Sequence, residues 1–122
     1  MRNTKYNYKH PYTVWENIKS DIETDIIRDV YGIGEKIPSI NDICQEYKVS
    51  NNTAVKALES LRNDGIILKK RGIGYFVKPY AKEILIKKHK DEFVDSLIKT
   101  IELGKRLGYE DKELLNEFKK NI

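Results

Sequence analysis

Two short apolar patterns, each with its own helix start signal, stand close together in the first half of the chain. Ser39 followed by Asp42 forms a capping box, in which each side chain satisfies a free backbone N–H at the start of a helix. The apolar face that follows consists of Ile40, Ile43, Cys44 and Tyr47. The sequence therefore predicts a short helix that ends at the Lys48-Val49 break.

A second helix is expected directly after this break, where Ser50 can cap its start. Apolar residues then recur at i, i+3, i+4 and i+7 and form a stripe that faces a core: Ala54, Ala57, Leu58 and Leu61. The opposite side carries Asn51, Asn52, Val55, Lys56 and Glu59. The helix is predicted to end at Asn63-Asp64-Gly65, because these residues tolerate positive φ.

A basic β-hairpin is predicted next. Its strand-like runs, Ile66-Ile67-Leu68 and Tyr75-Phe76-Val77, flank the cationic, glycine-containing segment from Lys69 to Gly74. Residues 66–80 contain four Lys or Arg side chains and no acid, namely Lys69, Lys70, Arg71 and Lys78. Two helices joined by a tight break and followed by such a hairpin are the layout of a winged helix-turn-helix, which places its second helix in the major groove of duplex DNA.

The order and spacing of these residues resemble the N-terminal domain of GntR-type bacterial transcription regulators. That pattern runs roughly G-x-x-[LI]-P-S-x-R-x-[LI]-A, then V-S-R-x-T-V-x-x-A-L-x-x-L-x-x-x-G-x-[IL], then G-x-G-[TS]-[FY]-V. The matching residues here are Gly34, Ile37-Pro38-Ser39, Asp42-Ile43, Val49-Ser50, Asn52-Thr53, Lys56-Ala57-Leu58, Leu61, Gly65-Ile66 and Gly72-Ile73-Gly74-Tyr75-Phe76-Val77. The resemblance implies a DNA-binding transcription regulator, a repressor that blocks promoter access without chemistry of its own.

The resemblance and the helix-turn-helix layout together predict the DNA-binding residues: Ser39, Asn41, Ser50, Asn51, Asn52, Thr53, Val55, Lys56, Lys70, Arg71 and Gly72. The family usually has arginine where this chain has Asn41 and Asn51, and both arginines hold DNA. Their loss should weaken the salt-dependent part of binding. Asparagine can instead bond to an adenine edge, and Val55 could lie against a thymine methyl, so we expect an A·T-rich operator. Alternatively, Asn51 supports the helix start and touches no DNA.

Both ends of this unit carry further patterns. Val14, Ile18, Ile22 and Ile26 recur every fourth residue, with Trp15 beside them, and predict a helix that packs across both helices of the DNA-binding unit. The preceding arm is basic and aromatic, with Arg2, Lys5, Tyr6, Tyr8, Lys9 and His10. It could touch backbone phosphates, although a frayed terminus is the plainer interpretation.

The chain changes character after Pro79, and we expect a DNA-binding domain over residues 1–80 and a helical dimerisation segment over residues 81–122. A long helix is predicted up to Gly104, a turn at Leu107-Gly108-Tyr109, and a short helix from Lys112 to Lys120. The predicted dimerisation residues are Phe93, Val94, Leu97, Ile98, Ile101, Leu107, Leu114, Leu115 and Phe118.

Two helices alone cannot bury both of these apolar faces, so a partner is implied, most simply a second copy. The shortness of the tail resembles the small YtrA-like branch of the family, in which two helices serve dimerisation. Packing of the tail onto its own N-terminal helix is the alternative. A tail this short leaves little room for an ordinary pocket, so no small-molecule effector is predicted. The predicted class is mostly α (α+β), a winged helix-turn-helix with a two-stranded wing and a two-helix tail.

Composition narrows the remaining functions. The net charge of +4 is only mildly basic, and a single cysteine excludes an internal disulfide. No apolar run approaches the roughly 20 residues needed to span a bilayer, and the N-terminus lacks the apolar segment of a secretory signal, so we expect a cytoplasmic protein. No nucleophile, base and orienting group fit together, Cys44 is interpreted as structural, and His10 and His89 stand alone. We therefore predict no catalytic residue, no metal site, no cofactor and no enzymatic activity. The alternative function is a winged-helix module that binds protein and has lost strong DNA binding.

Overall fold

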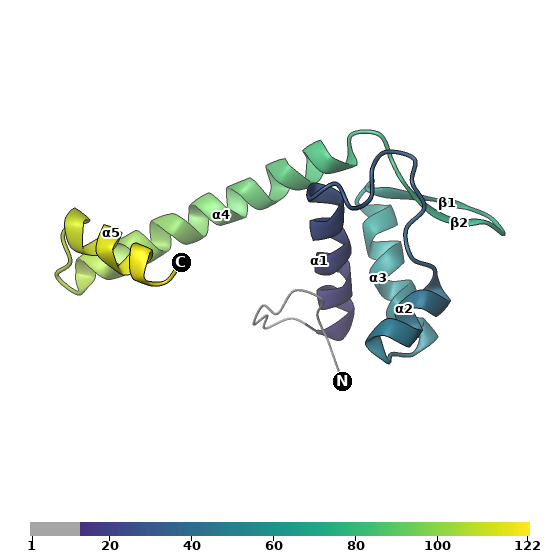
Figure 1. The fold of residues 1–122 in the computed structure, drawn as a ribbon, viewed down its shortest axis with the longest axis horizontal. Coiled ribbons are helices and arrows are strands. Elements are labelled where there is room, and N and C mark those ends of the chain that lie inside the picture. Colours follow the sequence, from purple (N-terminus) through teal and green to yellow (C-terminus); the bar gives the residue numbers. More distant parts are fainter. Residues whose placement is uncertain (1–12) are drawn as a thin grey trace. The chain divides into compact units, whose positions relative to one another are not determined.

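The computed structural model describes residues 13–122, which form a mostly helical chain with one small sheet (Figure 1). The elements are α1 (Val14–Ile27), α2 (Ile40–Tyr47), α3 (Asn51–Asn63), β1 (Ile67–Lys70), β2 (Gly74–Val77), α4 (Ala81–Arg106) and α5 (Asp111–Lys120). They make two compact units, the first extending to Ile86 and the second covering Lys87–Ile122. The predicted winged helix-turn-helix with following helices is confirmed.

Helix α1 contacts both helices of the predicted DNA-binding unit. The Tyr47 hydroxyl of α2 donates to Asp21 Oδ2 of α1 over 2.5 Å, in buried surroundings. On the α3 side, Lys19 Nζ donates to Ser60 Oγ over 2.8 Å and pairs with Asp64 Oδ2 at 2.7 Å. The predicted packing of the leading helix across α2 and α3 is therefore confirmed. The basic arm before it, including His10, lies outside the described residues.

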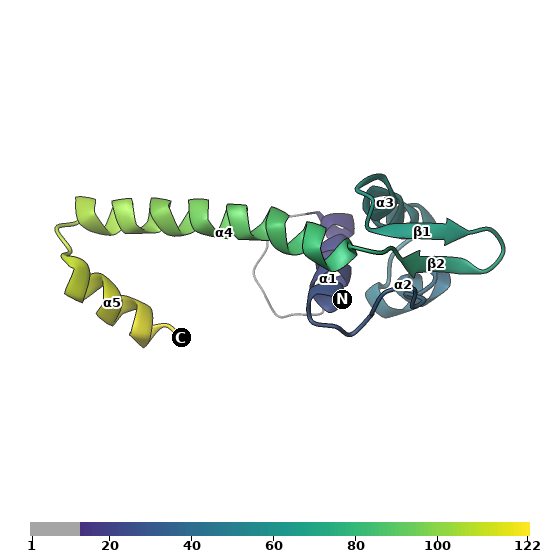
Figure 2. The ribbon, with the colours of Figure 1, turned by 90° about the horizontal axis from the view of Figure 1, so that it is seen from above.

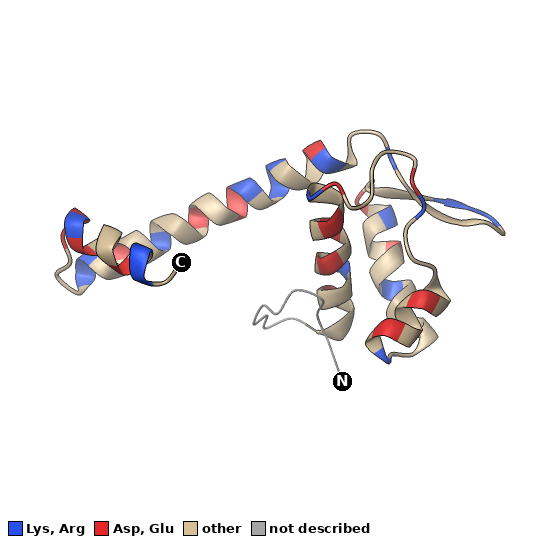
Figure 3. Cartoon of the chain, in the orientation of Figure 1, with Lys and Arg blue, Asp and Glu red and all other residues tan. Residues whose placement is uncertain are grey.

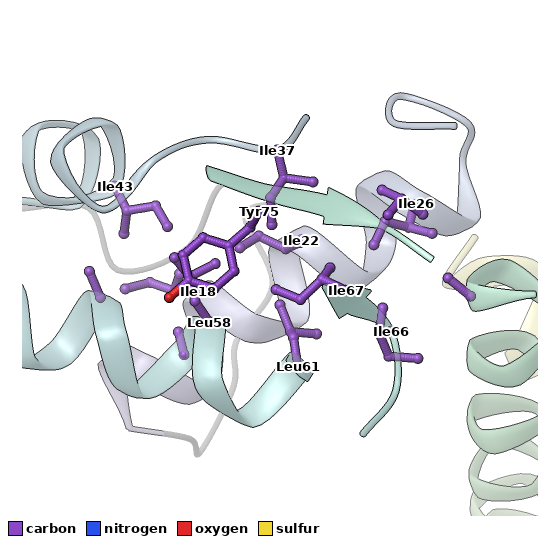
Figure 4. Close-up of a cluster of buried hydrophobic side chains, with 14 of the residues drawn as sticks. Ile18, Ile22, Ile26, Ile37, Ile43, Leu58, Leu61, Ile66, Ile67 and Tyr75 are labelled. Atoms are coloured by element: carbon purple, nitrogen blue, oxygen red, sulfur yellow. The ribbon is translucent and has the colours of Figure 1, made fainter. Parts of the chain in front are cut away.

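The predicted apolar faces of the helices pack against one another in the core of the first unit. Ile18, Ile22 and Ile26 of α1 face the stripe of α3, and residues of the wing close the cluster from the other side (Figure 4). The buried apolar residues are Ile18, Ile22, Ile26, Ile37, Ile43, Tyr47, Ala54, Ala57, Leu58, Leu61, Ile66, Ile67, Tyr75, Val77, Ala81 and Leu85. Burial of so many large side chains fixes the exposed face of α3 relative to the wing.

The turn between α2 and α3 is set by local chemistry. The predicted capping box is present, since Asp42 N donates to Ser39 Oγ over 3.1 Å and Ser39 N donates to Asp42 Oδ2 over 3.0 Å. Lys48 ends α2 in a left-handed conformation with φ of 56°. Ser50 then caps α3 by accepting from Thr53 N over 3.3 Å. The chain thus reverses within three residues and starts α3 at a defined angle.

The wing is a two-stranded antiparallel hairpin with the register Ile67↔Val77, Leu68↔Phe76, Lys69↔Tyr75 and Lys70↔Gly74. The strands lie nearer the tip than predicted, because Lys69 and Lys70 pair across the hairpin and Ile66 stays outside it. The other edge of β2 is also covered, since Ile37 N donates to Tyr75 O over 3.0 Å and Val77 N to Glu35 O over 3.0 Å. Lys36 therefore pairs with Phe76 in a single antiparallel bridge at the edge of the two-stranded sheet.

Helix α4 begins inside the core of the first unit, where Ala81 and Leu85 are both 1% exposed. Lys82 Nζ contacts both carboxylate oxygens of Asp29 at 2.8 Å and fastens this first turn to the loop after α1. The helix thus begins directly after the boundary expected near residue 80, and the division between the two compact units falls within it, between Ile86 and Lys87.

The second unit consists of the rest of α4 and of α5. Helix α4 runs to Arg106, two residues beyond the predicted end at Gly104, because Gly104 is buried in the helix and its missing side chain leaves room for Leu114. The predicted turn is confirmed: Gly108 has φ of 88°, and Tyr109 N donates to Gly104 O over 3.0 Å. Helix α5 starts at Asp111, one residue before the predicted Lys112.

Candidate nucleic-acid interface

The outer face of α3 carries the side chains that sequence analysis assigned to base reading. Asn51, Asn52 and Lys56 are exposed, while Thr53 and Val55 are half-buried. Lys56 Nζ lies 4.9 Å from the centroid of the Trp15 ring, which holds the lysine toward the start of α1. The first two turns of α3 therefore present amide, hydroxyl, methyl and ammonium groups on one side.

The side chain of Asn51 has a partner within the protein. The Cys44 thiol of α2 donates to Asn51 Oδ1 over 3.2 Å. Because the carbonyl oxygen accepts this weak hydrogen bond, the amide is oriented with its NH2 group away from Cys44. The sequence interpretation treated Cys44 as structural and did not foresee this contact.

The two predicted serines act first as helix caps. Ser39 Oγ and Ser50 Oγ each accept a backbone N–H of their own helix, and Ser50 Oγ also lies 3.1 Å from Thr53 Oγ1. Asn41 is exposed on the first turn of α2. DNA contacts by Ser39, Asn41 and Ser50 remain predictions.

A contact between the wing and α3 was missed by sequence analysis. The Tyr75 hydroxyl donates to Glu59 Oε2 over 3.1 Å, and Arg62 Nη1 donates to Glu59 Oε1 over 3.2 Å. Burial, followed by the hydrogen bond to Glu59, raises the pKa of Tyr75 above its ordinary value. Glu59 therefore accepts hydrogen bonds from two donors, and the bond from Tyr75 joins β2 of the wing to α3.

The tip of the wing carries the predicted cations. In Figures 1 and 2 the β1–β2 turn projects beyond α2 and α3, and Figure 3 shows Lys and Arg residues along it. Lys70, Arg71 and Gly72 are exposed, and Gly72 has the positive φ of 76° that this turn requires. Lys70 Nζ lies 4.4 Å from the centroid of the Phe76 ring. The wing also holds Lys36, which sequence analysis missed because its pairing with β2 is a long-range contact.

The predicted dimerisation residues all lie in the second unit. Most of them are exposed, including Phe93 at 65%, Leu97 at 41% and Phe118 at 61%, whereas Ile101 and Leu114 are half-buried. In residues 13–122 no group of three or more His, Cys, Asp or Glu side chains could hold a metal ion. The same part of the chain forms no helix that is long and apolar enough to cross a membrane.

Bacterial transcription regulators are similar in sequence to the first unit, and in one case to most of the chain. The "Probable fructoselysine utilization operon transcriptional repressor" of Escherichia coli is 34% identical over 71 residues, which are 58% of this chain but only 29% of that protein. The transcriptional repressor YtrA of Bacillus subtilis is 25% identical over 109 residues, covering 89% of this chain and 83% of that protein. The predicted resemblance to the small YtrA-like branch is thus supported over the tail as well.

Solved structures share the fold. A GntR family transcriptional regulator from Listeria monocytogenes has a TM-score of 0.71 at 21% identity, over 93% of this chain and 98% of that chain. The DNA-binding domain of AraR in complex with its operator ORR3 has a TM-score of 0.51 at 26% identity, over 57% of this chain and 92% of that chain. The model of the bacterial regulatory proteins of the gntR family matches residues 15–77, from α1 to the end of the wing. The chain belongs to the gntR family of bacterial regulatory proteins.

Proposed function

We propose that this protein is a transcription regulator that binds operator DNA through α3 and the wing. The observation that carries the proposal is the polar outer face of the first turns of α3, beside a wing whose exposed tip bears Lys70 and Arg71. A helix of about 10–12 Å diameter fits the major groove, and cations on a neighbouring hairpin can reach phosphates or the minor groove. No covalent chemistry is needed for this role.

Relatives support the proposal. The AraR domain that resembles the first unit is bound to operator DNA in its solved structure, and the relatives from E. coli and B. subtilis are transcriptional repressors. Repression by blocking promoter access is therefore the mode of action we propose. The chain spans only 29% of the length of the E. coli relative.

We further propose that residues 81–122 make the protein a homodimer. Phe93, Leu97 and Ile98 lie on one side of α4, and each is at least 41% exposed. A second copy would cover this apolar side, and a two-fold dimer matches the pseudo-palindromic sites that helix-turn-helix proteins read. An operator with two related half-sites follows from this arrangement.

The test is selection of bound duplexes from a random pool, followed by titration of the enriched duplex at several salt concentrations. We expect an enriched, A·T-rich site with two half-sites, and binding that weakens steeply as salt rises. A matched duplex with scrambled half-sites is the control. Enrichment of no sequence, together with salt-independent or undetectable duplex binding, would reject the proposal and favour the protein-binding alternative.

A further inference from the structure

The outer face of the wing contains a lysine that comes from a distant part of the sequence. The segment around Lys36 pairs with β2, with Gly34 N donating to Val77 O over 2.9 Å and Ile37 N donating to Tyr75 O over 3.0 Å. Paired residues of neighbouring strands have their side chains on the same face. Lys36, Phe76, Gly74 and Lys70 therefore share one face, because Lys36 pairs with Phe76 and Lys70 pairs with Gly74.

The Lys36 side chain runs over Gly74. A Cβ atom at Gly74 would lie 2.7 Å from Lys36 Cε and 3.6 Å from Lys36 Nζ, so the lysine chain occupies the space that a side chain at position 74 would fill. The ammonium group is thereby directed along β2 toward the tip of the wing. The positive φ of 146° at Gly74 also disfavours any other residue there.

Lys70 lies over the neighbouring position of the same face, since its Nζ atom is 4.4 Å from the Phe76 ring centroid. Two ammonium groups are thus held on one face, next to the exposed Arg71 of the turn. Among residues 13–122, no carboxylate forms an ion pair with Lys36 or Lys70. The positive charge of Lys36 contributes to the lowered pKa of Asp42, but the Asp42 carboxylate already accepts a hydrogen bond from Ser39 N in the capping box.

Like charges on one face that form no ion pair repel each other, and an anion bound beside them relieves that cost. We propose that Lys36 is a further DNA-binding residue, which contacts a backbone phosphate beside the wing together with Lys70. The inference rests on the proposed function, and it extends the cationic surface from the turn to the edge strand that precedes α2. A phosphodiester is the ligand, so the contact contributes affinity and register without reading base sequence.

The test uses variants that keep the packing of the wing. Lys36→Met preserves the aliphatic stem over Gly74 and removes only the charge, whereas Lys36→Arg retains the charge. Lys99→Met, on an exposed position of α4 in the second unit, is the matched control for loss of one positive charge. Each protein is titrated with the selected duplex over a series of salt concentrations, and its preference is measured across single-base variants.

We expect Lys36→Met to lower the slope of log affinity against log salt by about one unit, as for one lost phosphate contact, with base preference unchanged. Lys36→Arg should keep the wild-type slope, and Lys99→Met should leave it unaltered. A wild-type slope in Lys36→Met, or a changed base preference, would overturn the inference while leaving the proposed function intact. Failure of the wild-type protein to bind any duplex would overturn both.

Discussion

The thiol of Cys44 donates a hydrogen bond to Asn51 Oδ1 over 3.2 Å, so a residue of α2 orients the first side chain of α3. Asn51 stands where the family usually has an arginine that holds DNA. An amide with a fixed rotation can present its NH2 group to a base edge or a phosphate at lower entropic cost than a freely rotating one. Asn51 thus accepts a hydrogen bond from Cys44 that an arginine at this position could not accept, because a guanidinium group has no acceptor atom.

The first prediction concerns this pair. If Asn51 reads adenine, Asn51→Ala should cost on the order of 1 to 3 kcal/mol on the preferred site and flatten the preference at one base pair. Cys44→Ala should flatten the same position to a smaller extent, because the amide then rotates freely, and Cys44→Ser should restore the preference by supplying a hydroxyl donor. Binding to all single-base variants of the operator measures this. Identical profiles for wild type and Asn51→Ala would mean that Asn51 only supports the helix start.

The second prediction concerns the tip of the wing. Arg71→Ala should reduce the salt slope of operator binding by about one unit and leave base preference unchanged, as for a phosphate contact. Arg106→Ala, an exposed arginine at the end of α4, serves as the control for charge loss. A shifted base preference with an unaltered slope would instead place Arg71 in the minor groove.

The third prediction tests the dimer. Leu97→Asp puts a charge on the exposed apolar side of α4, and the variant should sediment as a monomer at micromolar concentrations at which we expect the wild type to be a dimer. Its affinity for a two-half-site operator should fall, because two linked contacts become independent. Ser96→Asp, an exposed polar position of the same helix, should remain dimeric. A dimeric Leu97→Asp protein would place the subunit contact elsewhere.

The fourth prediction concerns the contact of Gly104 with Leu114. Glycine to alanine in the interior of a helix ordinarily stabilises it by about 1 kcal/mol. Here the new methyl group would overlap Leu114 Cδ2, so we expect Gly104→Ala to destabilise the second unit by about 1 to 3 kcal/mol. Thermal unfolding, monitored by circular dichroism, shows whether the variant is more or less stable than the wild type. The double variant Gly104→Ala with Leu114→Ala should recover stability, and stabilisation by Gly104→Ala alone would contradict the packing of α5 on α4.

The fifth prediction concerns pH. Hydrogen bonds from the Ser39 backbone and side chain lower the pKa of Asp42. A depressed pKa in the folded state adds stability above the unfolded-state value of about 3.9, and this stability is lost as pH falls through the lower folded value. Asp42→Asn should therefore lower Tm at neutral pH, and its difference from wild type should shrink below about pH 4. Thermal unfolding of both proteins over a series of pH values measures this, and a Tm difference that stays constant from neutral pH to about pH 3 would contradict the expected contribution of the capping box.

The sequence predicted the parts of the fold that depend on local signals. The capping box of Ser39 and Asp42, the stripe from Ala54 to Leu61 and the turn at Gly108 are each encoded within a few residues, and all three are present. Strand limits were less accurate, because the extent of β1 depends on pairing with β2 rather than on its own composition.

Contacts between distant residues could not be predicted in the same way. Nothing near Cys44 indicates that it would meet Asn51, and nothing near Glu59 indicates that it would bond to Tyr75, because both pairs arise only when helices and wing pack together. The continuation of α4 past Gly104 also depends on a contact between helices. A glycine weakens an isolated helix, but here it leaves room for the Leu114 side chain of α5.

The empty space at Gly74 has an evolutionary consequence. The Lys36 side chain crosses the wing through this space, and its exposed far end could move aside for a Cβ atom at position 74. In an aligned set of relatives, glycine should therefore recur at position 74 whatever the length of the side chain at position 36, because the φ of 146° disfavours any other residue there.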